Sequence, residues 1–375
     1  MRIGVDAREL TGRPTGVGRY LAELLGAWAD PAAGIAGRHE FLLYGPAALP
    51  DAVTSRVGAL RPRVRVLRGR GGTFWEQVTL PAAASRDGLD VLFAPAYTAP
   101  LRLSCPIVLT IHDVSYFAHP EWFGWRDGLR RRVVTRLSAR RAAAVLTVSE
   151  FSRSEILSHL GLPAGKVHAI PHGAGVPAFL AGSGPEAGGT TPTPGSEPLV
   201  LFVGSMLNRR RLPDLIAAFR LVLAAVPEAR LEIVGENRTY PYQDLEALSL
   251  SSGAGDRVRI RSYVPDEELA AAFRTASVFA FLSEYEGFGL TPLEALASGI
   301  PPVLLDTRVA REICGPAARY VPRGDVPAVA AALVDLLTHG EARAALLNEA
   351  ADVLARYSWP EAARRTMDLI ESAGG

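Results

Sequence analysis

The chain has 375 residues, of which 48% are hydrophobic and 21% are charged, and its formal net charge is +1. This length predicts two domains, each with its own core, and the composition is that of an ordinary globular protein. No run of 18 or more apolar residues occurs, which excludes a membrane-spanning helix, and residues 1–10 lack the apolar stretch of a signal peptide. Cys105 and Cys314 have no metal-ligand spacing and are expected to be buried thiols in a reducing cytoplasm.

The two halves of the chain differ in charge. Residues 1–180 carry 22 Lys and Arg against 14 Asp and Glu, which gives +8. Residues 181–375 carry 18 against 25, which gives −7. We therefore expect the halves to bind different ligands.

The first half alternates short apolar segments with helical patterns, for example a helix over 17–29. This alternation is typical of a mostly parallel sheet covered by helices. The expected strands are 2–6, 40–44, 64–67, 90–94, 107–111 and 143–148.

Residues 181–198 interrupt this pattern with Gly, Pro, Ser and Thr, and we expect a flexible linker there. The alternation then resumes, and a last helix is expected at 359–372. Two doubly wound domains would place the active site in the cleft between them. The predicted domains are 1–180 and 199–356, followed by a tail at 357–375. The strands expected in the second half are 199–203, 231–234, 258–261, 277–282 and 302–305.

Two turns of the first half contain residues that can carry chemistry. Gly16 and Gly18 follow the first strand, but a third glycine is missing, so a dinucleotide site is not expected. His112 and Asp113 end a strand, where α/β folds keep their catalytic groups. An isolated histidine is more often structural, and Asp113 is more typical of a turn or of a residue that orients the histidine.

Residues 121–141 begin with three aromatic side chains and continue with seven arginines. A basic helix led by aromatic residues can lie on anionic lipid. The pattern favours a second interpretation, in which Val133, Val134 and Leu137 pack on the sheet while the arginines stay solvated.

A strand at 199–205 is followed by Asn208, Arg209, Arg210 and Arg211 before the next helix. Guanidinium groups bind phosphate oxygens in pairs, so this turn is suited to a pyrophosphate. The alternative is a basic loop that faces water.

Residues 284–305 combine a glycine-rich loop, a helix and a strand. Thr291 is a suitable N-cap and Pro292 a suitable first helical residue, so we expect the helix to open at about 291. Gly287 and Gly289 allow backbone amides to approach an anion at the helix N-terminus.

Two carboxylates, Glu286 and Glu294, bracket this loop and can face one ligand. Amides that attract an anion, beside carboxylates that accept hydroxyl hydrogen bonds, indicate a phosphorylated sugar. The alternative is a helix capped by chance, with Glu294 merely solvated.

This segment resembles the E-x7-E signature of the retaining glycosyltransferases of family 4, which have the GT-B fold. Residues 109–113, 148–152, 204–211 and 261–268 resemble other segments of that family, and the likeness covers nearly the whole chain. The resemblance implies an α/β protein with two Rossmann-like doubly wound domains facing across a cleft, and a C-terminal helix that crosses back to the first domain.

The resemblance also implies roles for single residues. Glu286 would contact the donor sugar, Glu294 the nucleotide ribose, and the loop amides the diphosphate. Arg209 and Arg210 would bind the diphosphate, with Arg210 at a position where the family has Lys. The implied catalytic residues are Glu286, His112 and Arg210, and the implied donor-binding residues are Gly16, Gly204, Ser205, Arg209, Arg210, Tyr263, Val264, Glu286, Gly287, Phe288, Gly289, Leu290, Thr291 and Glu294.

The function implied is retaining transfer of a sugar from a nucleotide-diphosphate donor, held by the second domain, to an acceptor hydroxyl in polysaccharide or glycoconjugate synthesis. The implied chemistry is a same-face attack in which the departing phosphate helps to deprotonate the acceptor. No Asp-x-Asp occurs, so no metal and no further cofactor are expected.

The alternatives are a GT-B nucleotide-sugar epimerase and an inactive sugar-nucleotide binding protein. The expected partners are a nucleotide-sugar donor and a saccharide or lipid-linked acceptor, with a candidate peripheral membrane contact through 121–141 at the inner face of the membrane and no nucleic acid.

Overall fold

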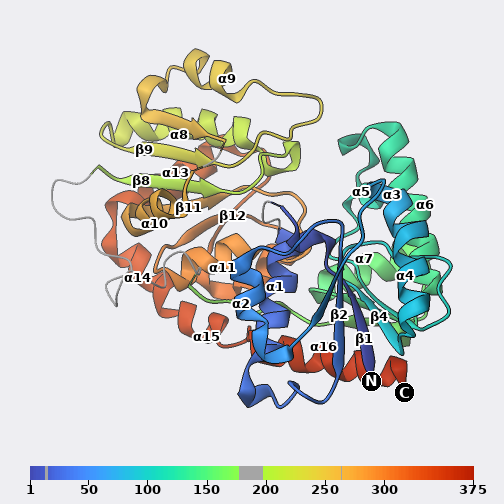
Figure 1. Cartoon of the computed structure of the whole chain (residues 1–375). Helices are drawn as coiled ribbons and strands as arrows, with labels where there is room; N and C mark the ends of the chain where they lie inside the picture. Colours follow the sequence, from blue (N-terminus) through green and yellow to red (C-terminus); the bar gives the residue numbers. More distant parts are fainter. Residues whose placement is uncertain (13–15, 177–196, 263) are drawn as a thin grey trace. The chain divides into compact units, whose positions relative to one another are not determined.

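The computed structural model describes residues 1–12, 16–176, 197–262 and 264–375. The described residues form two compact units (Figure 1). Unit 1 comprises Met1–Pro120, Trp125–Gly173 and Tyr357–Gly375, and unit 2 comprises Glu121–Gly124 and Ala174–Arg356. The expected linker at 181–198 lies, except for its last two residues, outside the described ranges.

The described part of unit 1 contains a seven-stranded parallel sheet in the order β3-β2-β1-β4-β5-β6-β7. The order reverses between β1 and β4, which makes the carboxyl ends of these strands a topological switch point. The strands are β1 (Arg2–Asp6), β2 (Glu40–Gly45), β3 (Arg63–Val66), β4 (Val91–Ala94), β5 (Ile107–Thr110), β6 (Ala144–Thr147) and β7 (Val167–Ala169).

Helices cover both faces of this sheet, because successive residues of each strand point to opposite sides. On β2, for example, Phe41 and Leu43 join one buried cluster, and Leu42 and Tyr44 join the other. A π-helical turn at Trp75–Thr79 joins two of the helices. The helices are α1 (Gly16–Ala29), α2 (Asp51–Arg56), α3 (Gly72–Phe74), α4 (Leu80–Asp87), α5 (Ser115–Ala118), α6 (Trp125–Arg141), α7 (Glu150–Leu160) and α16 (Trp359–Gly374).

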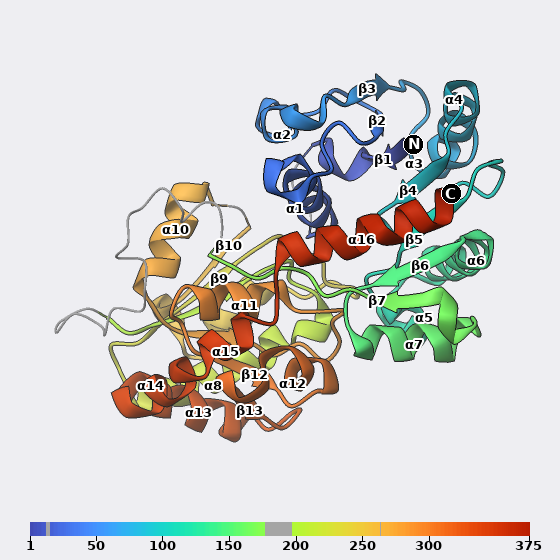
Figure 2. The same ribbon diagram turned by 90° about the horizontal axis from the view of Figure 1, so that it is seen from below.

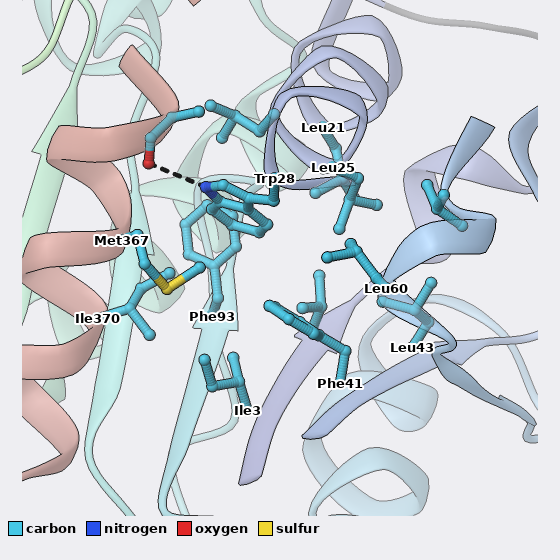
Figure 3. Close-up of a cluster of buried hydrophobic side chains, with 14 of the residues drawn as sticks. Ile3, Leu21, Leu25, Trp28, Phe41, Leu43, Leu60, Phe93, Met367 and Ile370 are labelled. Atoms are coloured by element: carbon cyan, nitrogen blue, oxygen red, sulfur yellow. Dashed lines mark hydrogen bonds between the residues drawn. The ribbon is translucent and has the colours of Figure 1, made fainter. Parts of the chain in front are cut away.

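Helix α16 belongs to unit 1 although it follows unit 2 in the sequence. It packs beside α1 and along β4 and β5 (Figure 2). Figure 3 shows Met367 and Ile370 of α16 beside Trp28 and Phe93, and the indole Nε1 of Trp28 donates to the carbonyl oxygen of Ala363 at 2.9 Å. The expected C-terminal helix that packs with the first half is therefore confirmed.

The described part of unit 2 contains a six-stranded parallel sheet in the order β10-β9-β8-β11-β12-β13, which reverses between β8 and β11. The strands are β8 (Leu199–Val203), β9 (Arg230–Val234), β10 (Val258–Arg261), β11 (Ala276–Phe281), β12 (Pro302–Leu305) and β13 (Arg319–Val321). The helices are α8 (Leu212–Ala225), α9 (Leu245–Ser251), α10 (Asp266–Thr275), α11 (Leu290–Ala297), α12 (Arg308–Cys314), α13 (Val326–Thr338), α14 (Gly340–Asn348) and α15 (Ala350–Leu354).

The structure contains every expected strand, to within a residue or two at the ends, and adds β7 and β13, which are only three residues long. One helix start differs from expectation. Helix α11 begins at Leu290, and its N-cap is Gly289 with φ of 111°, not Thr291. Glycine adopts this backbone conformation at little cost, and it therefore turns the chain into the helix without a side-chain cap.

The favoured interpretation of α6 is wrong in one respect. Val133 and Leu137 are 47% and 45% exposed, so they do not pack on the sheet. The buried side of α6 is made of small residues, among them Thr135 and Ser138, whose hydroxyls bond to Tyr116 and Ala99. Small side chains allow the helix to approach closely, and the larger apolar residues are left on the outside. Across the described ranges, no helix is both long and apolar enough to cross a membrane.

Candidate functional site

The loops after β8 and β11 meet at the switch point of unit 2, where ligands bind in open α/β sheets. The backbone N–H of Glu284 donates to the carbonyl oxygen of Arg209 at 2.8 Å and joins the two loops. Two segments that lie 75 residues apart are thereby held together. The arginine-rich turn and the first glutamate of the E-x7-E pattern consequently form one cluster.

At the centre of this cluster, two arginines surround the carboxylate of Glu286. Arg210 Nε donates to Glu286 Oε1 at 3.0 Å, and an Arg209 terminal nitrogen lies 3.7 Å from Oε2. The hydroxyl of Ser283 donates to Oε1 at 2.9 Å. The three charged side chains are only 13–15% exposed, and their net charge of +1 still favours an anion.

Arg210 is fixed by three further features. A terminal guanidinium nitrogen of Arg210 donates to the carbonyl oxygen of Ser205 at 2.8 Å, and the guanidinium carbon lies 4.8 Å from the ring centroid of Phe281. Gly204 has φ of 142°, and a Cβ there would come within 2.4 Å of the Arg210 side chain. Glycine therefore suits this position because of its backbone conformation, and a side chain there would also displace the guanidinium from its present place.

Burial raises the pKa of Glu286, but the charges of Arg210 and Arg209 and the hydrogen bonds from Arg210 and Ser283 outweigh it and hold this pKa below its ordinary value. Glu286 is therefore an anion at neutral pH, able to accept hydrogen bonds from hydroxyl groups.

Glu294, the second glutamate of the pattern, lies on α11 and is only 4% exposed. The alternative of a merely solvated Glu294 is therefore wrong. The loop before this helix contains Gly287, Phe288 and Gly289, and Phe288 is buried. A pocket in unit 2 is lined by residues of this loop and of the start of α11, among them Ser283, Glu286, Phe288, Gly289 and Pro292, and by largely apolar residues of β12 and α12.

Two of the implied donor-binding residues, Tyr263 and Val264, precede α10 in the sequence. Val264 is 5% exposed and sits just ahead of this helix. Tyr263 lies outside the described residues.

The sequence interpretation overlooked Ser283 and Glu284. Glu284 has a side chain that is 6% exposed, between Arg211 at 3.2 Å and Arg323 at 3.0 Å. Glu284 lies two residues before Glu286 and shortly after a buried strand, and this spacing of two Glu residues is a pattern that could have indicated Glu284. No comparable pattern marks Ser283.

In unit 1, Gly16 is the first residue of α1, and His112 follows β5 with 8% exposure. The His112 Nε2 lies 2.8 Å from the carbonyl oxygen of Pro95. A carbonyl oxygen can only accept, so Nε2 carries the proton and Nδ1 carries the lone pair. Burial lowers the pKa of His112, and the ring is neutral at neutral pH.

Asp113 forms a turn, because its carboxylate accepts from the Ser115 N–H at 2.8 Å, and the expectation of a turn residue is confirmed. It also accepts from the Tyr97 hydroxyl at 3.2 Å. Tyr97 itself has φ of 61°, which is unusual for a bulky residue.

A buried ion-pair group at the end of β1 was also not predicted. Arg8 lies 2.7 Å from Asp6 and 2.5 Å from Glu76, and the Thr98 hydroxyl donates to Glu76 at 2.6 Å. These contacts fix the π-helical turn that contains Glu76 against the switch point of unit 1.

Comparisons with known proteins agree with this architecture. The profile described as glycosyl transferases group 1 matches residues 189–353, and that described as glycosyltransferase family 4 matches residues 14–175. The crystal structure of Anabaena Alr3699/HepE in complex with UDP and glucose aligns with a TM-score of 0.72 and 19% identity over 99% of both chains. The fold is therefore that of the GT-B class.

Two curated relatives extend the likeness to the sequence. The phosphatidyl-myo-inositol mannosyltransferase of Mycolicibacterium smegmatis is 30% identical over 399 aligned positions, which cover 100% of this chain and 95% of that protein. The O-antigen chain mannosyltransferase B of Escherichia coli is 28% identical over 305 residues, which cover 77% of this chain and 76% of that protein. The chain belongs to glycosyltransferase family 4 (group 1). It is a glycosyltransferase, and the epimerase alternative is not favoured.

Proposed function

We propose that this glycosyltransferase transfers mannose from a nucleotide-diphosphate donor to an acceptor hydroxyl, with retention. The observation that carries the proposal is the cluster of Arg209, Arg210 and Glu286 at the switch point of unit 2. Mannose is the sugar named for both curated relatives described above.

In this proposal the diphosphate binds to Arg209 and Arg210, which present paired donors to phosphate oxygens. The carboxylate of Glu286 accepts hydrogen bonds from sugar hydroxyls, and Glu294 accepts those of the ribose. The amides around Gly289 and the start of α11 add positive potential at the phosphates. His112 accepts a hydrogen bond from a sugar hydroxyl through Nδ1.

No metal is needed in this proposal, because the two guanidinium groups supply the positive charge that stabilises the leaving diphosphate. Retention follows from attack on the face that the phosphate leaves, with a phosphate oxygen taking the acceptor proton. Turnover that is unchanged by EDTA is expected. A loss of turnover that Mg²⁺ or Mn²⁺ restores would contradict this part.

The donor is tested by thermal melting with a panel of GDP-mannose, UDP-glucose, ADP-glucose and dTDP-glucose. A ligand at a hundred times its dissociation constant stabilises the folded state by about 2.7 kcal/mol. We expect the mannosyl donor to give the largest shift, and analysis of the reaction product to show an α-linked mannoside. A panel with no shift at all would contradict the donor site.

A second proposal concerns the place of the acceptor: α6 contacts an anionic membrane surface, so that a lipid-linked acceptor is in reach. One face of α6 carries apolar side chains four residues apart that are 45–69% exposed, namely Trp125, Leu129, Val133 and Leu137. Such a face beside arginines is suited to the interface of an anionic bilayer.

The arginines of α6 divide into two groups. Arg132, Arg136 and Arg141 donate to the carbonyl oxygens of Tyr116, His159 and Leu103, and they hold the helix in place. The others are exposed at the surface, where an arginine contributes about 1 kcal/mol to binding of anionic lipid; Arg130 and Arg131 also pair with Asp127. The exposed arginines are Arg126, Arg130, Arg131 and Arg140.

The experiment is sedimentation with vesicles of phosphatidylglycerol and phosphatidylcholine at low and high salt. We expect Leu129→Glu with Val133→Glu to abolish binding. Leu221→Glu is a matched control, because Leu221 is a leucine of α8 in unit 2 that is 42% exposed. Absence of binding to anionic vesicles at low salt would contradict the membrane contact and indicate a soluble acceptor.

A further inference from the structure

Four ring side chains from distant parts of the sequence, one of them His112, form a group in unit 1 in which Tyr20, His112 and His172 are buried and Trp359 is partly buried. Tyr20 comes from α1, His112 follows β5, His172 follows β7, and Trp359 begins α16. His112 and His172 are 8% and 4% exposed. The hydroxyl of Tyr20 lies 3.3 Å from the hydroxyl of Thr110, within hydrogen-bond distance.

The ring of His112 is held by one hydrogen bond and by three neighbouring rings, one of which is Tyr97 with its centroid 5.5 Å away. Its Nε2–H donates to the Pro95 carbonyl oxygen at 2.8 Å. Tyr20 meets the ring edge-on, with centroids 4.9 Å apart and planes at 88°. His172 stacks on it, with centroids 5.8 Å apart and planes at 24°. Together these contacts fix the orientation of the ring and the nitrogen that carries its proton.

His172 is in turn packed against the first residue of α16. The ring centroids of His172 and Trp359 are 5.5 Å apart. A Cβ on the neighbouring Gly173 would come within 2.4 Å of the Trp359 backbone nitrogen, so only glycine allows this approach. The chain leaves unit 1 after Gly173 and returns to it at Tyr357. The contact between His172 and Trp359 therefore joins the segment that leaves unit 1 to the segment that returns to it.

We infer that His172 and Trp359 are positioning residues for sugar transfer. They hold the His112 ring so that its Nδ1 lone pair is presented in one orientation to a sugar hydroxyl. Helix α16 is then required for the chemistry of unit 1 as well as for its core. This inference rests on the role proposed above for His112.

The chemistry explains why the supporting residues are neutral and aromatic. Burial lowers the pKa of His112 more strongly than the Asp113 carboxylate raises it, and a further anionic neighbour would favour a protonated ring that could no longer accept a hydrogen bond. Stacked and edge-on rings restrict rotation of the imidazole without offering it a competing hydrogen bond. A misplacement of a reacting group by about 1 Å can cost about a hundredfold in rate.

The experiment uses the full-length enzyme with His172→Ala, His172→Phe, Trp359→Leu and Trp28→Phe. Turnover and the Michaelis constant of the donor are measured for each, and ¹⁵N-histidine NMR reports which ring nitrogen of His112 is protonated. We expect His172→Ala and Trp359→Leu to lower kcat about tenfold with little change in KM, because binding is kept and orientation is lost. A ring free to rotate no longer keeps its Nε2–H on the Pro95 carbonyl oxygen, so in both variants the His112 signals should move toward a mixture of the two neutral tautomers.

Two variants are controls. His172→Phe keeps an aromatic ring on His112 and should retain most of the turnover. Trp28→Phe removes the hydrogen bond between α1 and α16 without touching the stack, and it should alter thermal stability but not the His112 tautomer. Equal losses of turnover in Trp28→Phe and Trp359→Leu would overturn the inference, since α16 would then act only through stability.

His112→Asn separates this inference from the proposed function. Full turnover in His112→Asn would overturn both the role of His112 and the positioning role, while sugar transfer itself would stand. A large loss in His112→Asn together with wild-type turnover and an unchanged tautomer in His172→Ala would overturn the positioning role alone. Absence of transfer by the wild-type enzyme with every donor of the panel would overturn the proposed function, whereas the tautomer measurement would still decide whether His172 orients His112.

Discussion

The proposed sugar-contacting residues of the two units, Glu286 and His112, lie at the carboxyl ends of strands but in different surroundings. Unit 2 has Glu286 between two arginines, all partly accessible and charged. Unit 1 has His112, buried among aromatic rings and neutral. The same architecture therefore serves two tasks: a net positive cluster suits a diphosphate, and a neutral ring with one lone pair suits a hydroxyl.

The largest effect is expected for the carboxylate of unit 2. Glu286→Gln keeps the shape of the side chain but removes its charge, and we expect turnover to fall about a hundredfold or more. Binding of the nucleotide diphosphate itself should not weaken, because Arg209 and Arg210 lose a carboxylate that competes with the phosphates. Steady-state kinetics and calorimetry measure the two quantities.

Glu284→Gln is the control for that change, because Glu284 is buried in the same loop but pairs with other arginines. A smaller loss of turnover is expected there. Equal losses in both variants would mean that Glu286 acts through the fold of the loop rather than through the sugar.

The next effect concerns the arginines. Arg210→Ala should weaken binding of the nucleotide diphosphate about tenfold or more, since a charge-assisted hydrogen bond contributes about 1.5–3 kcal/mol. Affinity for the nucleoside should change little. Calorimetry with both ligands tests this, and a matched loss for both would remove the assignment to the diphosphate.

Arg210→Lys sharpens the same test. The guanidinium bonds to Glu286 and to the Ser205 carbonyl oxygen while it packs on Phe281. An ammonium group cannot make these contacts together, so Lys should not restore wild-type affinity although it keeps the charge. Wild-type affinity in this variant would show that charge alone is needed at position 210.

A smaller effect is expected for Glu294→Ala. Loss of the ribose contact should weaken binding of the nucleoside and of the nucleotide diphosphate equally, by about tenfold. This pattern is the opposite of that of Arg210→Ala, and the two variants together separate ribose from phosphate recognition. Unchanged nucleoside affinity would refute the ribose assignment.

The sequence predicted the sheets of both units and the loop that contains Glu286, because strands and glycine-rich turns have local patterns. It did not predict that Arg210 and Glu286 touch, since their pairing depends on the order of β8 and β11 in the sheet. The stack of His172 on His112 is equally non-local. Residue types alone favoured a buried apolar face on α6, whereas Thr135 and Ser138 are the residues that pack inward.

The last and smallest effect is the pH dependence of stability, which should differ between the two units. Burial lowers the pKa of both His112 and His172 below 6.5, so the stability that their neutral forms contribute is complete above pH 6.5 and is lost as pH falls through the lower folded-state values. In Glu286, burial is outweighed by Arg210 and Arg209, and its pKa lies below 4.5. The stability from ionised Glu286 is therefore complete above pH 4.5 and is lost only below it.

Melting temperatures are measured between pH 7.5 and 3.5. Compared with the wild-type protein, His172→Phe should lose less thermal stability as the pH falls below 6.5. Glu286→Gln should differ from the wild-type protein in this respect only below pH 4.5. If both variants changed the same pH range, the contrast between a neutral site in unit 1 and a charged site in unit 2 would be wrong.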